Sequence, residues 1–200
     1  TLGELGKHAE AEAMEREVLA AEREELGPRH PSTLTTMGNL AATLGKLDKH
    51  AEAEAMGREA LTARREVMGP RHPDTLITMY WLALTLGELG KHAEAEAMER
   101  EVLAARREVL GARHPDTLTA MHNLASTLGE LGKHAEAEAM KREVLSARRE
   151  ELGARHPDTL AAMHNLASTL GELGKHAEAE AMKREVLSAR REELGARHPD

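Results

Sequence analysis

The sequence predicts an all-α chain, an α-solenoid of stacked antiparallel helix pairs, and three observations lead to this prediction. The dipeptide His-Pro recurs at intervals of 42 residues, at His30, His72, His114, His156 and His198, and a fixed period of this size is typical of repeat architectures. Apolar residues within each period recur at three- and four-residue steps, as on one face of a helix. Aromatic residues make up only 1% of the chain, so the core must come from Leu, Met, Val and Ala, which requires closely packed helices.

The repeats organise the whole chain, 1–200, as one array. A partial repeat (1–30) precedes four full repeats (31–72, 73–114, 115–156 and 157–198). Residues 111–152 and 153–194 are identical except for Thr119 against Ala161. No linker or second domain is predicted. Because the opening phrase TLGELGKH recurs inside the chain, we expect the chain to be part of a longer protein.

The first helix of each repeat is predicted to begin at the proline of His-Pro. In one copy, the φ angle of Pro115 suits the first helical position, and the charge of Asp116 complements the positive helix end. One apolar stripe follows, made by Leu118, Met121, Leu124, Ala125 and Leu128. Gly132 is predicted to end this helix, because glycine readily takes the left-handed conformation found there. The equivalents are Gly6, Gly90, Gly174 and Asp48, and Asp tolerates this geometry.

The second helix, KHAEAEAMKREVLSARREELG in the same copy, is rich in strong helix formers and ends at Gly153. Its apolar side carries only Ala137, Met140, Val144 and Leu145. One helix pair cannot bury enough surface with these, so neighbouring repeats must stack. Glu138 and Arg142, like their equivalents, stand four residues apart and predict a solvated face. The Arg-Arg pairs are each followed by Glu and are also predicted to be solvated; they are Arg64 and Arg65, Arg106 and Arg107, Arg148 and Arg149, and Arg190 and Arg191.

The stretch NLASTLGELGKHAEAEAMKREVL resembles the tetratricopeptide repeat (TPR), with its Asn-Leu-Ala, its glycine turn and a small Ala early in the second helix. The resemblance covers the whole chain. Each repeat is 42 residues long, and in the last two full repeats the motif HPDTL is followed by NLA, LG and GKH. This pattern resembles the longer subclass of the repeat found in kinesin light chains and in fungal NOD-like (STAND) receptors. The family implies a right-handed superhelix whose concave groove, lined by the first helices, holds peptides or partner proteins. It implies no catalysis.

Comparison of the copies separates two sides of the first helix. Residue types are constant along one side, as a packed core requires; in the first full copy this side holds Leu34, Met37, Leu40, Ala41 and Leu44. On the other side of the helix, the residue types differ between copies at four positions. Counted in residues from the first of them, these positions lie at 0, 3, 4 and 7. These positions hold Thr35, Ile77, Thr119 and Ala161; Gly38, Tyr80, His122 and His164; Asn39, Trp81, Asn123 and Asn165; and Ala42, Leu84, Ser126 and Ser168. We expect the differing side to be exposed and, by the family resemblance, to line the groove.

One copy carries an apolar patch on this side, made by Ile77, Tyr80, Trp81 and Leu84, with the chain's only Tyr and Trp. These two residue types are over-represented among binding hot spots, so the patch is predicted to anchor a protein or peptide partner. Two alternatives are that the aromatics fill a narrow space against a neighbouring first helix, and that the copy has drifted. Polar partner contacts are predicted at Asn39, His122, Asn123, Ser126, His164, Asn165 and Ser168. In the resembled family, asparagines at the matching position contact a ligand's backbone.

The chain has 12 histidines, but ten belong to the His-Pro and Lys-His columns and are predicted to be architectural. The other two, His122 and His164, have no partner at metal-ligand spacing, so no metal is expected. For them we expect hydrogen bonding to a ligand and a charge change near the unperturbed imidazole pKa. No phosphate-binding glycine motif and no nucleophile with an adjacent base are present in the sequence. The sequence therefore predicts neither an enzyme nor a cofactor.

The amino-acid composition argues against two classes of partner, nucleic acids and membranes. A formal net charge of -8 opposes binding to nucleic acid, and no apolar run is long enough to span a membrane. The absence of cysteine fits a reducing compartment, and we expect a cytoplasmic protein. The predicted function is a non-enzymatic protein- or peptide-binding scaffold, the sensor region of a larger protein.

The alternative function is a structural spacer or self-assembly element. Residues 1–6 are expected to be the tail of a first helix, and Arg197 to Asp200 the beginning of one. Both ends would then expose stacking surfaces, which favours head-to-tail self-association.

Overall fold

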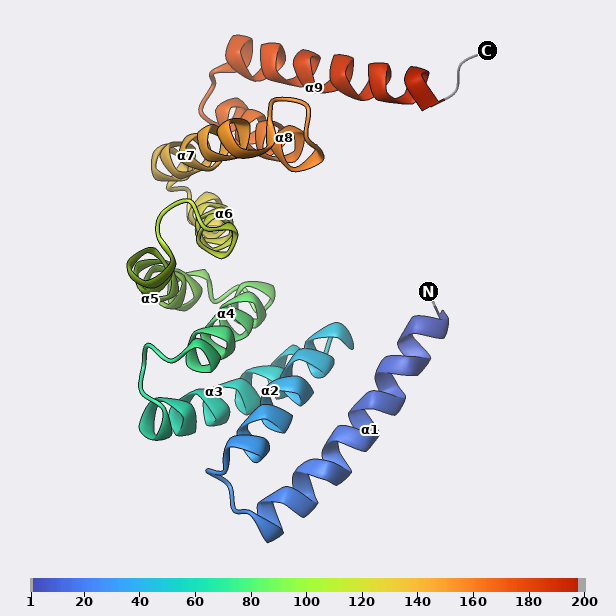
Figure 1. Cartoon of the computed structure of the whole chain (residues 1–200), viewed down its shortest axis with the longest axis vertical. Helices are drawn as coiled ribbons and strands as arrows, with labels where there is room; N and C mark the ends of the chain where they lie inside the picture. The colour runs from blue at the N-terminus through green and yellow to red at the C-terminus, as the bar shows by residue number, and fades with distance from the viewer. Residues whose placement is uncertain (1, 198–200) are drawn as a thin grey trace. The chain divides into compact units, whose positions relative to one another are not determined.

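The computed structural model describes residues 2–197 of the chain. Within these residues it forms nine α-helices (Figure 1): α1 (Leu2–Glu25), α2 (Pro31–Lys46), α3 (His50–Val67), α4 (Pro73–Glu88), α5 (His92–Leu110), α6 (Pro115–Glu130), α7 (His134–Leu152), α8 (Pro157–Glu172) and α9 (His176–Arg197). The predicted all-α class is confirmed. The first helices of the full repeats are α2, α4, α6 and α8. The chain divides into two compact units, Thr1–Ala105 and Arg106–Asp200, and each is described by itself.

Each first helix begins at the proline of His-Pro, as predicted, and the histidine is its N-cap. In α6, the Nδ1 atom of His114 accepts a hydrogen bond of 3.2 Å from the backbone N–H of Asp116. His30, His72 and His156 accept the same hydrogen bond. An N-cap side chain satisfies one of the backbone N–H groups that a helix start leaves unpaired. These four histidines are therefore architectural, while His198 lies outside the described residues.

The turn between the two helices of a repeat requires a left-handed backbone at one position. Gly90, Gly132 and Gly174 have φ angles of 71°, 71° and 73° there. Asp48 has a φ of 58° and is the non-glycine residue with positive φ in the part of the chain that the structure describes. The prediction for these four turns is confirmed.

We expect that replacing Asp48 with glycine raises the free energy of unfolding by about 0.5 to 1 kcal/mol. A left-handed backbone costs an L-residue about 1–2 kcal/mol, and the greater entropy of glycine in the unfolded state offsets part of the gain. Thermal unfolding followed by circular dichroism measures the effect. The reverse substitution, Gly132→Asp, should lower stability by a similar amount. A loss of stability in Asp48→Gly would contradict this account of the turn.

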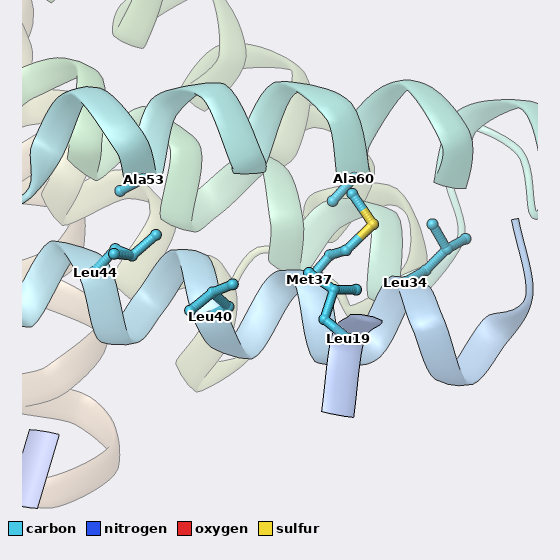
Figure 2. Packing of buried hydrophobic residues seen from close by; sticks show 7 residues of the cluster. All are labelled: Leu19, Leu34, Met37, Leu40, Leu44, Ala53 and Ala60. Atoms are coloured by element: carbon cyan, nitrogen blue, oxygen red, sulfur yellow. The ribbon is translucent and has the colours of Figure 1, made fainter. Parts of the chain in front are cut away.

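The first unit is held together by an apolar layer between α2 and its neighbours α1, α3 and α4. Figure 2 shows side chains of α2 between Leu19 of α1 and the small Ala53 and Ala60 of α3. Small residues on α3 let the two helices of the repeat approach closely. The large apolar residues of α2 in this layer, Leu34, Met37, Leu40 and Leu44, are each no more than 1% exposed.

The second unit repeats this layer in α6, α7, α8 and α9, each helix packing against the next. Met121, Leu124 and Leu128 of α6 are completely buried, as are Met163 and Leu166 of α8. The constant side of the first helices is thus the interior in both units, as predicted.

Three glutamates of the Glu-Arg pairs in the second helices, Glu12, Glu96 and Glu138, are buried, and Glu54 is half-buried, whereas Glu180 of α9 is exposed. Glu138 is 8% exposed and accepts hydrogen bonds from Arg142 at 2.9 Å and from Lys175 of the next repeat at 2.7 Å. Lys49 and Lys91 reach Glu12 and Glu54 in the same way. The predicted solvated face is therefore wrong for these carboxylates, because that prediction considered one helix and the lysine comes from the next repeat.

The described N-terminal segment does not form the tail of a first helix. α1 runs unbroken from Leu2 to Glu25, through Gly6. A segment of fewer than two turns buries too little apolar surface to hold an antiparallel turn, whereas continuing the helix adds backbone hydrogen bonds. Arg197 is the last residue of α9 rather than the beginning of another helix, and residues 198–200 lie outside the described residues. Both expectations for the ends are thus wrong where the structure describes them.

Candidate functional site

The variable side of the first helices is accessible to solvent in both units. Ile77 is 46% exposed and Trp81 43%, whereas Leu40 and Leu124 are 1% and 0% exposed. None of the predicted partner-contact residues is fully buried, and those exposed along with Ile77 and Trp81 are Asn39, Ser126, His164 and Ser168. Ile77 and Trp81 of the apolar patch are therefore not part of the buried hydrophobic interior.

A pocket of 490 Å³ lies in the first unit, between α2, α3 and α4. Ligand pockets typically have volumes of about 300–1,000 Å³. Seven of the eight variable positions of α2 and α4 line it: Thr35, Gly38, Asn39, Ala42, Ile77, Trp81 and Leu84. We call it the α2–α4 pocket. The three-dimensional arrangement thus brings three of the four predicted apolar residues, Ile77, Trp81 and Leu84, together in one concave site, with Asn39 as a polar group on its wall.

Tyr80 is not among the residues that line the α2–α4 pocket. Its ring meets the indole of Trp81 edge to face, with centroids 5.2 Å apart and an interplanar angle of 82°. Such pairs are favourable beyond their buried area, so this contact favours the orientation of the indole seen here.

The pocket depends on two glycines in helix interiors. A Cβ atom on Gly57 would lie 3.2 Å from Cδ1 of Leu82, and one on Gly38 would lie 3.7 Å from Nη2 of Arg64. The other copies carry side chains at both positions. Those equivalent to Gly57 are Glu15, Glu99, Lys141 and Lys183. Sequence reasoning missed Gly57 because only the first helices were compared column by column; the same comparison of the second helices identifies it.

Arg64 closes one end of the pocket and is 5% exposed, so its predicted place on a solvated surface is wrong. Its Nη1 atom donates to the backbone O of Asp74 and to Oγ1 of Thr78, both at 2.7 Å, and Nη2 donates to the backbone O of Leu34 at 3.1 Å. Burial lowers the pKa of Arg64, and the charge of Asp74 partly opposes this. The side chain thus links α2 to α4 and places a buried cation at the pocket wall.

The second unit has a polar surface at the equivalent positions. His122 is half-buried, and the Nδ2 atom of Asn123 is buried without a hydrogen-bond partner. Burial, with the nearby charges of Lys141 and Arg148, lowers the pKa of His122. The charge change of His122 is therefore shifted below the expected unperturbed value, which favours the neutral imidazole, a group that can both donate and accept a hydrogen bond.

Lys141 occupies the position that corresponds to Gly57. Its ammonium group donates to Oγ1 of Thr169 at 2.7 Å, and burial lowers its pKa. The side chain of Lys141 therefore fills the space that remains open in the first unit. Asn165, His164 and Ser168 of α8 complete this polar surface, which offers hydrogen bonds rather than an apolar pocket.

Among the described residues, no group of three His, Cys, Asp or Glu side chains is placed to hold a metal ion. Over the same residues, every helix is too short or too polar to cross a lipid bilayer.

Stacked helix pairs with one constant and one variable face define an α-helical repeat protein. The sequence matches the tetratricopeptide repeat family over residues 1–66, 39–108, 74–150 and 130–192. The chain therefore belongs to the tetratricopeptide repeat family. Domains of this family typically bind proteins and are generally non-catalytic. None of the curated proteins matches the chain.

Solved structures share this fold. A crystal structure of nearly identical TPR-like repeats from a Podospora anserina protein described as a kinesin light chain has a TM-score of 0.88 and 25% identity, covering 94% of this chain and 89% of its own. BtubC (BKLC) from P. vanneervenii has a TM-score of 0.84 and 22% identity, covering 98% of this chain and 77% of its own. The Podospora repeats support the predicted resemblance to the kinesin-light-chain type of repeat. Both structures share the fold, with helices packed sequentially as stacked pairs.

Proposed function

We propose that the variable face of the first helices binds a protein or peptide, as the sensor region of a larger protein. The apolar anchors are Ile77, Trp81 and Leu84, with Tyr80 supporting the indole. The polar contacts are Asn39, His122, Asn123, Ser126, His164, Asn165 and Ser168.

One observation carries this proposal: substitutions on three different helices converge on the α2–α4 pocket. Gly38, Gly57 and Trp81 each depart from the residue types of the other copies, and all three line it. Drift would scatter such changes over the surface. Convergence on one 490 Å³ pocket favours selection for an occupant, and Trp is the residue type most typical of binding hot spots.

The experiment uses a phage-displayed library of random peptides, selected on the whole chain. The affinities of the selected peptides are then measured on the double variant Trp81→Asn with Tyr80→His, which restores residue types found in the other copies. We expect the melting temperature to stay close to that of the wild type. We expect binding to weaken by about thirtyfold or more, since a hot spot contributes at least about 2 kcal/mol. Unchanged binding would contradict the proposal, and a large loss of helicity would show that the aromatics belong to the core.

A structural role is the second candidate. Val18 and Leu187 are each 49% exposed, whereas the equivalent residues of other repeats, such as Val144 and Leu145, are 3% and 5% exposed. Stacking of one chain on another would cover both. Val18→Glu combined with Leu187→Glu is the matched control for the experiment above: it abolishes self-association if the ends assemble, and leaves peptide binding unchanged if the variable face binds.

A further inference from the structure

The α2–α4 pocket is elongated and has different chemistry along its length. It is lined by α4 from Asp74 to Glu88, a distance of about 21 Å along a helix axis. Arg64 lies at the end near Asp74, while Trp81 and Leu84 form an apolar wall beyond it. Beyond Leu84 the far end is lined by Lys46, His50 and Glu88. An occupant that lies between Arg64 and Leu84 has one polar end and an apolar body.

Arg64 has one N–H donor without an acceptor on the side that faces the pocket. A guanidinium group has five N–H donors. Both donors of Nη1 are used, by Asp74 and Thr78, and Nη2 makes one hydrogen bond, to Leu34. Nε is buried without a partner. One donor of Nη2 remains beside Gly38, where the lack of a side chain leaves it uncovered.

The charge of Arg64 also lacks a direct counter-ion. Its three hydrogen bonds go to two carbonyl oxygens and a hydroxyl group, and no carboxylate among the described residues forms an ion pair with it. The carboxylate of Asp74 lies 3.9 Å from Nδ1 of His72 and is 45% exposed, so its charge acts on Arg64 without a direct hydrogen bond. A buried cation without a counter-ion is costly, and an anionic acceptor gives the shorter and stronger type of hydrogen bond.

The same pocket offers little to a peptide backbone. Trp81 stands where the other full copies have asparagine, so Asn39 is the one amide side chain among its lining residues. A peptide has a donor and an acceptor at each residue that need partners when buried, whereas a hydrocarbon chain has none. The lining therefore suits an aliphatic group, whether an apolar side chain of a peptide or a hydrocarbon chain, better than buried peptide backbone.

We propose that the α2–α4 pocket binds a free monocarboxylic acid with a long apolar chain, its carboxylate on Nη2 of Arg64 beside Gly38 and its chain along Trp81 and Leu84. This small-molecule site goes beyond the proposed recognition of a protein and does not depend on it. The polar surface of the second unit has no part in it.

The test uses Trp81 as its reporter, because it is the chain's only tryptophan. The whole chain is titrated with sodium decanoate below its micelle concentration while tryptophan emission is followed. Decanol, which has the same chain without the charge, is the matched ligand. We expect saturable binding of decanoate, and binding of decanol weaker by about tenfold or more because it cannot form a charge-assisted hydrogen bond. From hexanoate to decanoate, each methylene should strengthen binding about fourfold.

Two variants complete the test. Gly57→Lys introduces the lysine found at the equivalent positions 141 and 183, where the second helix of the repeat accommodates it. This variant should lose decanoate binding without loss of helicity. Arg64→Met should remove the preference for decanoate over decanol. Equal binding of the two ligands to the wild type would overturn the proposal, as would wild-type affinity for decanoate in Gly57→Lys or the absence of a saturable change with any acid of the series.

Discussion

Replacing Leu124 with alanine is expected to lower the free energy of unfolding by about 2–5 kcal/mol. Leu124 is completely buried in α6, and removing a buried leucine loses its transfer free energy and leaves a cavity that the packed neighbours fill only in part. Folded domains typically have unfolding free energies of about 5–15 kcal/mol, so this change removes a large share. Urea denaturation followed by far-ultraviolet circular dichroism measures the loss.

The control for this prediction lies on the same helix. Ser126 is exposed, and its Oγ donates to the backbone O of His122, a bond that adds little to a helix. Ser126→Ala should change stability by no more than about 0.5 kcal/mol. If the two substitutions had equal effects, the assignment of the constant side as the interior would fail.

Acid is expected to unfold the chain by breaking the carboxylate contacts that join successive repeats. Hydrogen bonds from Lys175 and then Arg142 hold the pKa of Glu138 below its ordinary value of 4.5, although burial opposes them. Glu12 and Glu54 have lowered pKa values for the same reason. Because these values are depressed in the folded state, the stabilisation is complete above pH 4.5 and is lost as the pH falls through the folded-state values. Melting temperatures measured from pH 7 downward should therefore drop steeply below about pH 4.5.

A pair of variants isolates this effect. Glu138→Gln removes a carboxylate shared by Arg142 and Lys175 and should lower stability at pH 7 by about 1 kcal/mol, within the usual range for hydrogen bonds to charged groups. It should also flatten the decline with acid. Glu180 is the equivalent residue in α9, is exposed and pairs with Arg184 of its own helix, so Glu180→Gln should have little effect. A Glu138→Gln variant that keeps the wild-type pH profile would contradict the role given to these contacts.

Local features of the fold could be predicted because they depend on neighbouring residues in the sequence. Pro115 begins a helix and Gly132 ends one through their own backbone preferences, and the apolar spacing around Leu124 marks the buried face. The comparison between copies likewise separated Trp81 from the interior, because the columns of Leu40 and Leu44 keep one residue type whereas the column of Trp81 does not.

Other features could not be predicted because they involve residues far apart along the chain. Arg64 looks like one more solvated arginine until α2 and α4 supply the oxygens that accept its hydrogen bonds. Gly57 matters only because it faces a pocket whose other walls belong to different helices. Gly6 is predicted to end a helix, but glycine permits a turn without requiring one, and α1 continues through it.

The sequence by itself determined the 42-residue period, the helix pair within it and the two faces of the first helix, because backbone preference and apolar periodicity act over a few residues. Tertiary structure alone decided that glycines on α2 and α3 and a tryptophan on α4 enclose one pocket with a buried guanidinium group. It also decided that Glu138 is buried between repeats rather than solvated. Burial and counter-charge are properties of packed surfaces, and those surfaces exist only once the repeats have stacked.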